Sequence, residues 1–179
     1  LQLPASLKEI GYSAFAGCEK LSGDLILGDN IEIIGRMAFG NCTGFAGYRL
    51  KLPAQLTEIP SWGFTDCGFV GELEIPAGVT KIEDWAFAAN AFTGNLVLPV
   101  GIEAIRDDAF AGNDFSGQVV IPKETELGRS VFSGCGKLES VVILSEIEEL
   151  QYGFFSGCTS LRKVVLPDSI IYIGGSMFD

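Results

Sequence analysis

Residues 96–113 read LVLPVGIEAIRDDAFAGN, and variants of this stretch recur along the whole chain. The most regular position of the repeat is the one that Phe110 occupies, because it is a phenylalanine in all eight successive units. These residues are Phe15, Phe39, Phe64, Phe87, Phe110, Phe132, Phe155 and Phe178. The separation ranges from 22 residues (Phe110 to Phe132) to 25 residues (Phe39 to Phe64). Because a unit this short cannot bury its own apolar face, the fixed period predicts a solenoid whose neighbouring coils share one core.

The positions around each phenylalanine repeat as well. Leu96, Leu98 and Pro99 give the pattern L-x-L-P, which predicts a short strand with both leucines facing inward and a proline that ends it. An aliphatic residue five positions before each phenylalanine predicts a second short strand or extended turn. This residue is Ile10, Ile34, Ile59, Ile82, Ile105, Leu127, Leu150 or Ile173. Ala109-Phe110 predicts one helical turn, so we expect an α/β solenoid of mostly short parallel β-strands with single helical turns.

The repeated unit resembles that of the BspA-like bacterial surface leucine-rich repeats, which read close to L-x-L-P…L-x-x-I-x-x-x-A-F-x-x-C-x-x-L. The matching residues include Leu98-Pro99, Ala109-Phe110, Leu166-Pro167 and Met177-Phe178. The resemblance covers essentially the whole chain and implies a right-handed leucine-rich-repeat stack, here of about eight coils in one domain, residues 1–179. It also implies a secreted or cell-surface bacterial protein that acts in adhesion or binds host and matrix components. Since Leu1 already fits inside a repeat, we expect the chain to be a fragment of a longer protein.

Composition narrows the classes of function. The chain has 12 Lys and Arg against 23 Asp and Glu, a formal net charge of −11, and no histidine. A surface this acidic repels phosphate backbones, so nucleic acid is not an expected partner. The absence of histidine removes the commonest general base and transition-metal ligand. We expect no enzyme, cofactor or metal, and neither a signal peptide nor a membrane-spanning segment is present in the sequence shown.

The cysteines share one slot of the repeat. Each lies three residues after one of the eight repeated phenylalanines, which we call the ladder phenylalanines. They are Cys18, Cys42, Cys67, Cys135 and Cys158. Asn90 and Asn113 occupy the same slot in the fourth and fifth units. A slot that accepts both residue types predicts a small, semi-polar side chain that satisfies buried backbone groups. A disulfide between neighbouring coils is the alternative, whereas a metal site would need ligands converging from several directions.

The outward residues of the L-x-L strands form the first candidate binding surface. The last four of them are Val97, Val120, Val142 and Val165. If they point outward, they form an apolar stripe on an exposed sheet, as at many interfaces. The simpler alternative is that valine suits strands. The stripe could bind a protein or matrix partner or a second copy of the chain.

Trp62 and Trp85 form the second candidate, because each lies two residues before a ladder phenylalanine in adjacent coils. Such indoles could hold a sugar ring or a protein loop, or they could simply cap the core. Nearby acidic residues are Glu83, Asp84, Glu103, Asp107 and Asp108. Paired carboxylates serve glycoside hydrolysis, but a solvated acidic face is the simpler interpretation. The leading hypothesis is a non-catalytic binding or adhesion module. The alternatives are a carbohydrate-binding or carbohydrate-active domain and a structural spacer.

Overall fold

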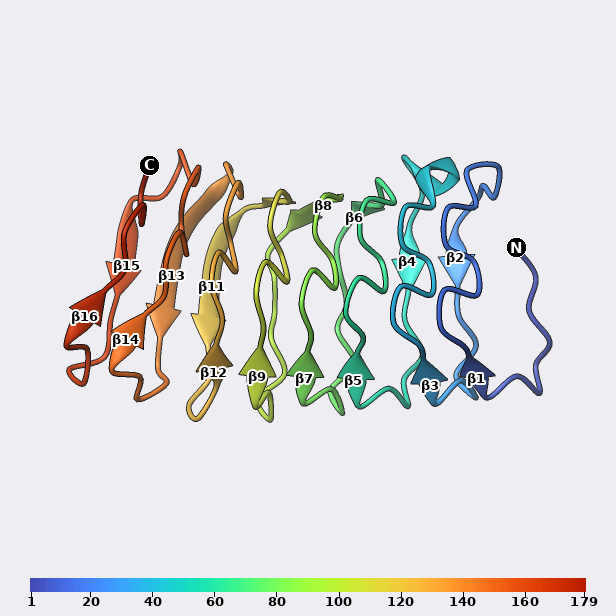
Figure 1. Cartoon of the computed structure of the whole chain (residues 1–179), viewed down its shortest axis with the longest axis horizontal. Helices are drawn as coiled ribbons and strands as arrows, with labels where there is room; N and C mark the ends of the chain where they lie inside the picture. The colour runs from blue at the N-terminus through green and yellow to red at the C-terminus, as the bar shows by residue number, and fades with distance from the viewer.

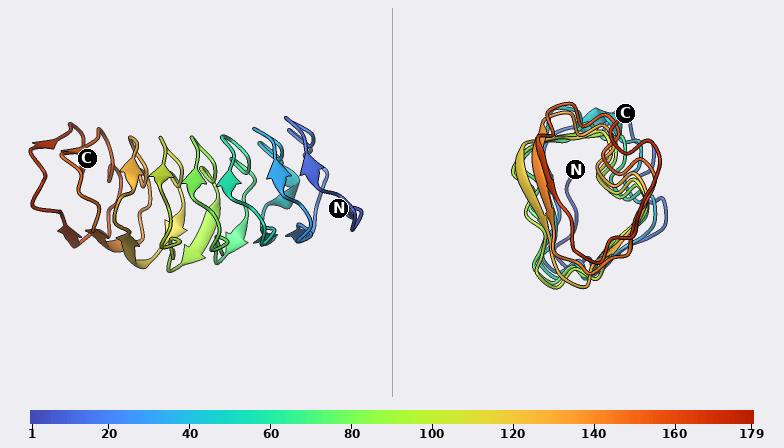
Figure 2. Two further views of the ribbon diagram at one scale, coloured as in Figure 1. Left: turned by 90° about the horizontal axis from the view of Figure 1, so that it is seen from below. Right: turned by 90° about the vertical axis from the view of Figure 1, so that its left-hand side faces the viewer.

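The computed structural model describes residues 1–179 and forms one elongated solenoid (Figure 1). All strand pairs are parallel, and the coils superimpose closely when they are viewed end-on (Figure 2). We divide each coil into three walls that follow one another along the chain. The Leu wall holds the L-x-L segments, the Ile wall holds the aliphatic residues five positions before the ladder phenylalanines, and the Phe wall holds the turns around those phenylalanines.

The Ile wall consists of two-residue strands. They are β1 (Glu9–Ile10), β3 (Ile33–Ile34), β5 (Glu58–Ile59), β7 (Lys81–Ile82), β9 (Ala104–Ile105), β12 (Glu126–Leu127), β14 (Glu149–Leu150) and β16 (Tyr172–Ile173). Four of them form one continuous sheet in the order β12-β9-β7-β5, whereas β1-β3 and β14-β16 are separate pairs. In most of them the first residue is exposed and the second is buried. The coils from β1 to β14 thus each contribute an aliphatic side chain to the core from this wall, whereas Ile173 of β16 is exposed.

The Leu wall is a sheet only near the two ends of the solenoid. Strands β2 (Leu25–Ile26) and β4 (Leu50–Lys51) pair in one sheet, and β11 (Gly117–Ile121), β13 (Leu138–Ile143) and β15 (Lys163–Val165) pair in another. Between them, residues 73–75 and 96–98 form no strand. The coils there pair earlier along the chain, through β6 (Val70–Gly71), β8 (Ala91–Gly94) and β10 (Asp114–Phe115). The segment that pairs with the neighbouring coils therefore changes along the solenoid, from the L-x-L segment near the ends to the segment before it in the middle.

The predicted helical turns are wrong, and with them the α/β part of the predicted fold class. The one helix is a 3-10 turn, η1 (Thr43–Phe45), and the Phe wall otherwise consists of overlapping turns. In these turns, alternate amides bond within the coil and to the next coil. Ala111 N–H donates to the Asp108 carbonyl at 3.1 Å, while Phe110 N–H donates to the Val131 carbonyl at 3.1 Å. A continuous helix would direct every amide along its own axis and leave the neighbouring coil unbonded.

The eight sequence units form about seven turns rather than eight coils. The first unit is incomplete because residues 1–3 form no strand. The last unit ends soon after β16, with Phe178 65% exposed. The eight phenylalanines from Phe15 to Phe178 are separated by seven intervals, which agrees with about seven turns.

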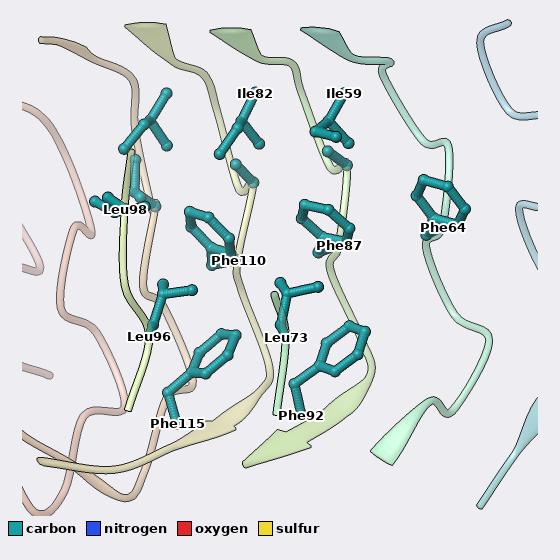
Figure 3. Packing of buried hydrophobic residues seen from close by; sticks show 14 of the residues in the cluster. Ile59, Phe64, Leu73, Ile82, Phe87, Phe92, Leu96, Leu98, Phe110 and Phe115 are labelled. Atoms are coloured by element: carbon teal, nitrogen blue, oxygen red, sulfur yellow. The ribbon is translucent and has the colours of Figure 1, made fainter. Parts of the chain in front are cut away.

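The predicted ladder forms the centre of the core. The rings from Phe15 to Phe132 stack with centroid separations of 5.1, 5.7, 5.7, 5.9 and 5.7 Å. Phe154 then packs edge-on against Phe132, and the last stacked pair is Phe155 with Phe178. A second column of stacked rings, which the sequence analysis missed, lies beside the first and consists of Phe45, Phe69, Phe92 and Phe115. Its spacing of 23 or 24 residues was the available signal. Figure 3 shows parts of both columns.

Candidate binding surfaces

The Leu wall presents the predicted valine stripe. On β11, Val119 and Ile121 are fully buried, whereas Val120 between them is 41% exposed. Val120 lies opposite Val142 in the ladder, and Val142 lies opposite Val165. The alternation of inward and outward side chains along each strand therefore places three valines in direct register on one exposed sheet.

The two ends of the stripe differ from its centre. Val97 is 67% exposed but lies in a segment without strand pairing, and Val165 is 38% exposed on β15. Val142 is only partly exposed. Leu144, which directly follows β13, is also exposed. The surface defined by Val97, Val120, Val142 and Val165, which we call the valine stripe, is thus part of a hydrogen-bonded sheet at β11-β13-β15 and lies outside any strand at Val97.

Trp62 and Trp85 lie together on the Phe wall. Their ring centroids are 5.0 Å apart and their planes differ by 11°. Both residues have left-handed backbones, with φ of 60° and 58°. Their backbone N–H groups donate to the backbone carbonyls of Asp84 and Asp107 in the next coil, both at 2.9 Å. These bonds offset the cost of the left-handed conformation, which is on the order of 1–3 kcal/mol for a non-glycine residue. Since the rings stack on each other along the solenoid, each covers one face of its neighbour.

Two of the acidic residues near the tryptophans, Asp84 and Asp107, accept hydrogen bonds from backbone amides of the next coil. Asp84 Oδ1 accepts a hydrogen bond from Asp107 N–H at 3.1 Å, and Asp107 Oδ1 accepts one from Arg129 N–H at 2.8 Å. Burial, together with Asp107 and Asp84, raises the pKa of the Asp108 carboxyl. Burial and the neighbouring Glu58 likewise raise the pKa of Glu83. The carboxylates of Asp84 and Asp107 therefore help to hold adjacent coils together.

The cysteine and asparagine slot is structural, as predicted. The Sγ atoms of Cys42 and Cys67 donate to the carbonyls of Phe15 and Phe39, at 2.9 and 3.0 Å. All five cysteines are free thiols. Burial raises the pKa of Cys135 to about 12 and that of Cys158 to about 11, so neither has the depressed pKa of a reactive thiol.

Asparagine makes more hydrogen bonds at this slot than cysteine does. Asn90 Nδ2 donates to the Phe64 carbonyl at 2.8 Å, which is the bond that a cysteine makes in other coils. Its Oδ1 also accepts the N–H of Phe69 at 3.0 Å. Asn113 repeats both bonds with Phe87 and Phe92. The middle coils therefore gain one extra bond per slot between neighbouring coils.

Three surface hollows lie along the Leu wall, beside the segments that form no strand. The first has a volume of about 660 Å³, and the charged residues of its lining are Asp24, Arg49, Lys51, Glu72 and Glu74. Two neighbouring hollows of about 430 and 420 Å³ also include Glu74, and the second reaches Val97. None of these three is lined by the tryptophans or by the acidic residues beside them. No group of three or more Cys, Asp or Glu side chains is arranged to hold a metal ion, and no helix is long and apolar enough to cross a membrane.

Comparisons with known proteins agree with the geometry. The sequence model of one protein family, the BspA-type leucine-rich-repeat region, matches residues 1–116 and 92–179 and includes six copies of the repeat. The chain is 28% identical to a leucine-rich repeat protein from Bacteroides ovatus, with a TM-score of 0.72, covering 99% of this chain and 51% of that one. It is 25% identical to a leucine-rich cell surface protein from Faecalibacterium prausnitzii, with a TM-score of 0.70, covering 98% and 56%.

A Treponema pallidum leucine-rich repeat protein is 27% identical, with a TM-score of 0.55, covering 94% of this chain and 67% of that one. A search of curated protein sequences gives no match. The chain thus spans little more than half the length of the first two structures that it resembles.

Proposed function

We propose that this chain, which belongs to the BspA-type leucine-rich-repeat family, is a non-catalytic binding module of a bacterial surface protein. Its Leu wall presents the valine stripe to a protein or extracellular-matrix partner, and the module acts in adhesion. The cell-surface location is supported by the leucine-rich cell surface protein to which the chain is similar.

The observation that carries the proposal is the register of Val120, Val142 and Val165. Exposed valines in direct register across three strands form one continuous apolar surface. The hydrogen-bonded sheet beneath them fixes their positions, so little entropy is lost when a partner covers them. Apolar surface that is held in place and open to solvent favours binding to another apolar surface.

Trp62 and Trp85 are the second contact that we propose, on the separate Phe wall. Tryptophan is enriched among residues that dominate binding energy at protein interfaces. The stacking at 5.0 Å covers one face of each indole, which reduces the area open to a sugar ring. A carbohydrate partner is therefore the second candidate, supported by the partly exposed indoles alone, because Asp84 and Asp107 bind backbone amides.

The test compares the wild-type chain with a variant carrying Val120→Lys and Val142→Lys. Surface plasmon resonance against purified matrix proteins and a glycan array is expected to show a protein partner whose binding is lost in the variant. Two buried ammonium groups would oppose the apolar contact. The melting temperature should stay close to that of the wild type, since both side chains point away from the core.

The matched control carries Ile33→Lys and Ile171→Lys, which place the same charge on exposed aliphatic residues away from the Leu wall. This control is expected to keep full binding. Binding that survives in the valine variant, or is lost equally in the control, would refute the stripe as the contact surface. Glycan binding that depends on Trp62 and Trp85 would favour the carbohydrate alternative. Dimerisation that is lost in the valine variant would identify a second copy as the partner.

A further inference from the structure

We propose that the largest hollow of the Leu wall recognises a pair of oppositely charged side chains on the protein partner, next to the apolar segment that covers the valine stripe. This inference rests on the proposed function and adds the chemistry and order of the partner's docking segment. The acidic side chain of the partner contacts Arg49 and Lys51, and its basic side chain contacts Glu72 and Glu74.

The hollow places its two signs of charge on successive coils. Arg49 and Lys51 belong to the coil of β4, whereas Glu72 and Glu74 belong to the next coil. The volume of about 660 Å³ is large enough to admit side chains of a partner. Asp24 also lines the hollow, on the coil before that of Arg49, and its Oδ1 accepts the Arg49 N–H at 2.9 Å. The hollow therefore carries both signs of charge on adjacent coils, and it is complementary to a ligand that carries both charges.

The side chains of Arg49, Lys51, Glu72 and Glu74 do not take part in an ion pair. The ion pairs of the molecule join Lys8 with Glu32, Arg106 with Glu126, and Lys137 with Asp114. The reason lies in the backbone. On one side of β4, Leu25 N–H and Leu27 N–H donate to the carbonyls of Arg49 and Lys51 at 2.9 and 3.0 Å. On its other side, no hydrogen bond joins residues 50–52 to residues 72–74, so the two coils are not held at the spacing of a ladder.

Two glycines position the inner pair of charges. A Cβ atom added to Gly71 would lie 3.5 Å from Arg49 Nε, and one added to Gly94 would lie 2.9 Å from Glu72 Cγ. Both glycines have positive φ, 84° and 78°. The side chains of Arg49 and Glu72 therefore lie against glycine backbone. A larger residue at Gly94 would displace Glu72, whereas the added contact of a Cβ at Gly71 with Arg49 would be an ordinary van der Waals contact. Charges held in this way lose less conformational freedom when a partner binds.

The order of the surface residues fixes the order of the partner's groups. Along the outward row of the Leu wall, Lys51 is followed by Glu74 and then by Val97, Val120 and Val142. A complementary segment has an acidic group first, a basic group second and apolar groups last. The reversed order would place like charges together, which costs binding energy.

The experiment uses two blocked peptides of identical composition as probes. One reads Glu-Ser-Lys-Ser-Val-Ser-Val and the other reads Lys-Ser-Glu-Ser-Val-Ser-Val, because alternate residues of an extended chain face the same surface. Calorimetry with the full chain is expected to give a dissociation constant about tenfold lower for the Glu-first peptide. The double variant Arg49→Glu with Glu72→Arg keeps the net charge and should abolish this preference, because each of the two coils then carries one charge of each sign.

The control variant Lys8→Glu with Glu32→Lys reverses an exposed ion pair outside the hollow and should leave the preference unchanged. Equal binding of the two peptides to the wild type, a preference that survives reversal of Arg49 and Glu72, or an equal change in the control would overturn the inference. Circular dichroism of each variant establishes that the solenoid is still folded.

The valine variant separates this inference from the proposed function. If both hold, Val120→Lys with Val142→Lys weakens both peptides and keeps their ranking. If neither peptide binds the wild type but a matrix protein binds through the valines, this inference fails and the proposed function stands. If the ranking persists and the valine variant weakens neither peptide, nor any protein of the matrix panel, the proposed function fails and the charged hollow stands.

Discussion

The middle coils and the C-terminal coils differ in which wall carries the longer sheet. In the middle, β5, β7, β9 and β12 form a continuous sheet on the Ile wall, while the Leu wall lacks strands at residues 73–75 and 96–98. Towards the C-terminus, β11, β13 and β15 close the Leu wall, and the Ile wall is interrupted between β12 and β14. A ladder holds strands about 4.8 Å apart, whereas an unbonded wall is free of this limit. The same repeat therefore gives a flat apolar sheet in one region and charged hollows in the other.

The two regions also differ in local sequence. The middle units read Asn90-Ala-Phe92-Thr-Gly94 and Asn113-Asp-Phe115-Ser-Gly117, and their strands β8 and β10 lie immediately after the asparagine slot. The glycines at the end have positive φ and turn the chain. The C-terminal unit after Cys135 has no such turn between Leu138 and Ile143, so β13 runs straight along the Leu wall. The turn alone does not decide the pairing, because β11 starts at Gly117, which also has a positive φ, and pairs with β13 on the Leu wall.

The largest expected effect tests the shared core of the middle coils. Phe87 stacks between Phe64 and Phe110 and is fully buried, so Phe87→Ala should lower the free energy of unfolding by about 3–5 kcal/mol. The same change at Phe178, the exposed end of the ladder, should cost under about 1 kcal/mol. Urea unfolding measures both. Equal losses at the two positions would contradict a ladder that depends on neighbours on both sides.

The asparagine slot can be converted to the type found in the C-terminal coils. Asn90→Cys keeps a donor for the Phe64 carbonyl but leaves the Phe69 N–H without its acceptor. We expect a loss of about 1–3 kcal/mol, the usual cost of an unsatisfied buried group. Chemical denaturation provides the measurement. A variant as stable as the wild type would show that the extra bond of the middle coils is dispensable.

Cys135 makes the stability of the C-terminal coils depend on alkaline pH. Burial raises its pKa from the ordinary 9.0 to about 12, so the folded state favours the neutral thiol. This contribution is complete below pH 9 and is lost as the pH rises from 9 towards 12. Cys135→Ala should cost about 1 kcal/mol at pH 7 through the lost hydrogen bond to Phe110, and less at pH 10.5. A difference that stays constant with pH would exclude a raised pKa.

The smallest effect is expected at Asp108, which follows Trp62 and Trp85 in the same slot of the next coil. Its pKa is raised by burial and by Asp107 and Asp84, so its charged form destabilises the folded state above the ordinary pKa of 3.8. Asp108→Asn should raise the melting temperature slightly at pH 7, and asparagine tolerates the left-handed φ of 54°. The gain should vanish at pH 3. A gain at pH 3 as large as at pH 7 would rule out the charge as its cause.

Much of the site could be read from the repeat itself. The outward position of Val120 followed from the alternation of Val119, Val120 and Ile121, and the buried slot of Cys42 followed from its exchange with asparagine. The charged hollow could not be read in this way. Lys51 and Glu74 occupy equivalent positions in adjacent units, which in a closed ladder would be near neighbours. Only the absence of hydrogen bonds between residues 50–52 and residues 72–74 reveals a hollow there.

The sequence by itself determined the solenoid, the phenylalanine ladder and the inward and outward faces of the strands, because these depend on periodicity within and between units. The tertiary structure decided that turns replace the helical segments, that eight units make about seven turns, and which wall carries the sheet in each region. These features depend on hydrogen bonds between residues more than twenty positions apart. Such bonds form only when coils lie against each other, so a single repeat does not contain them.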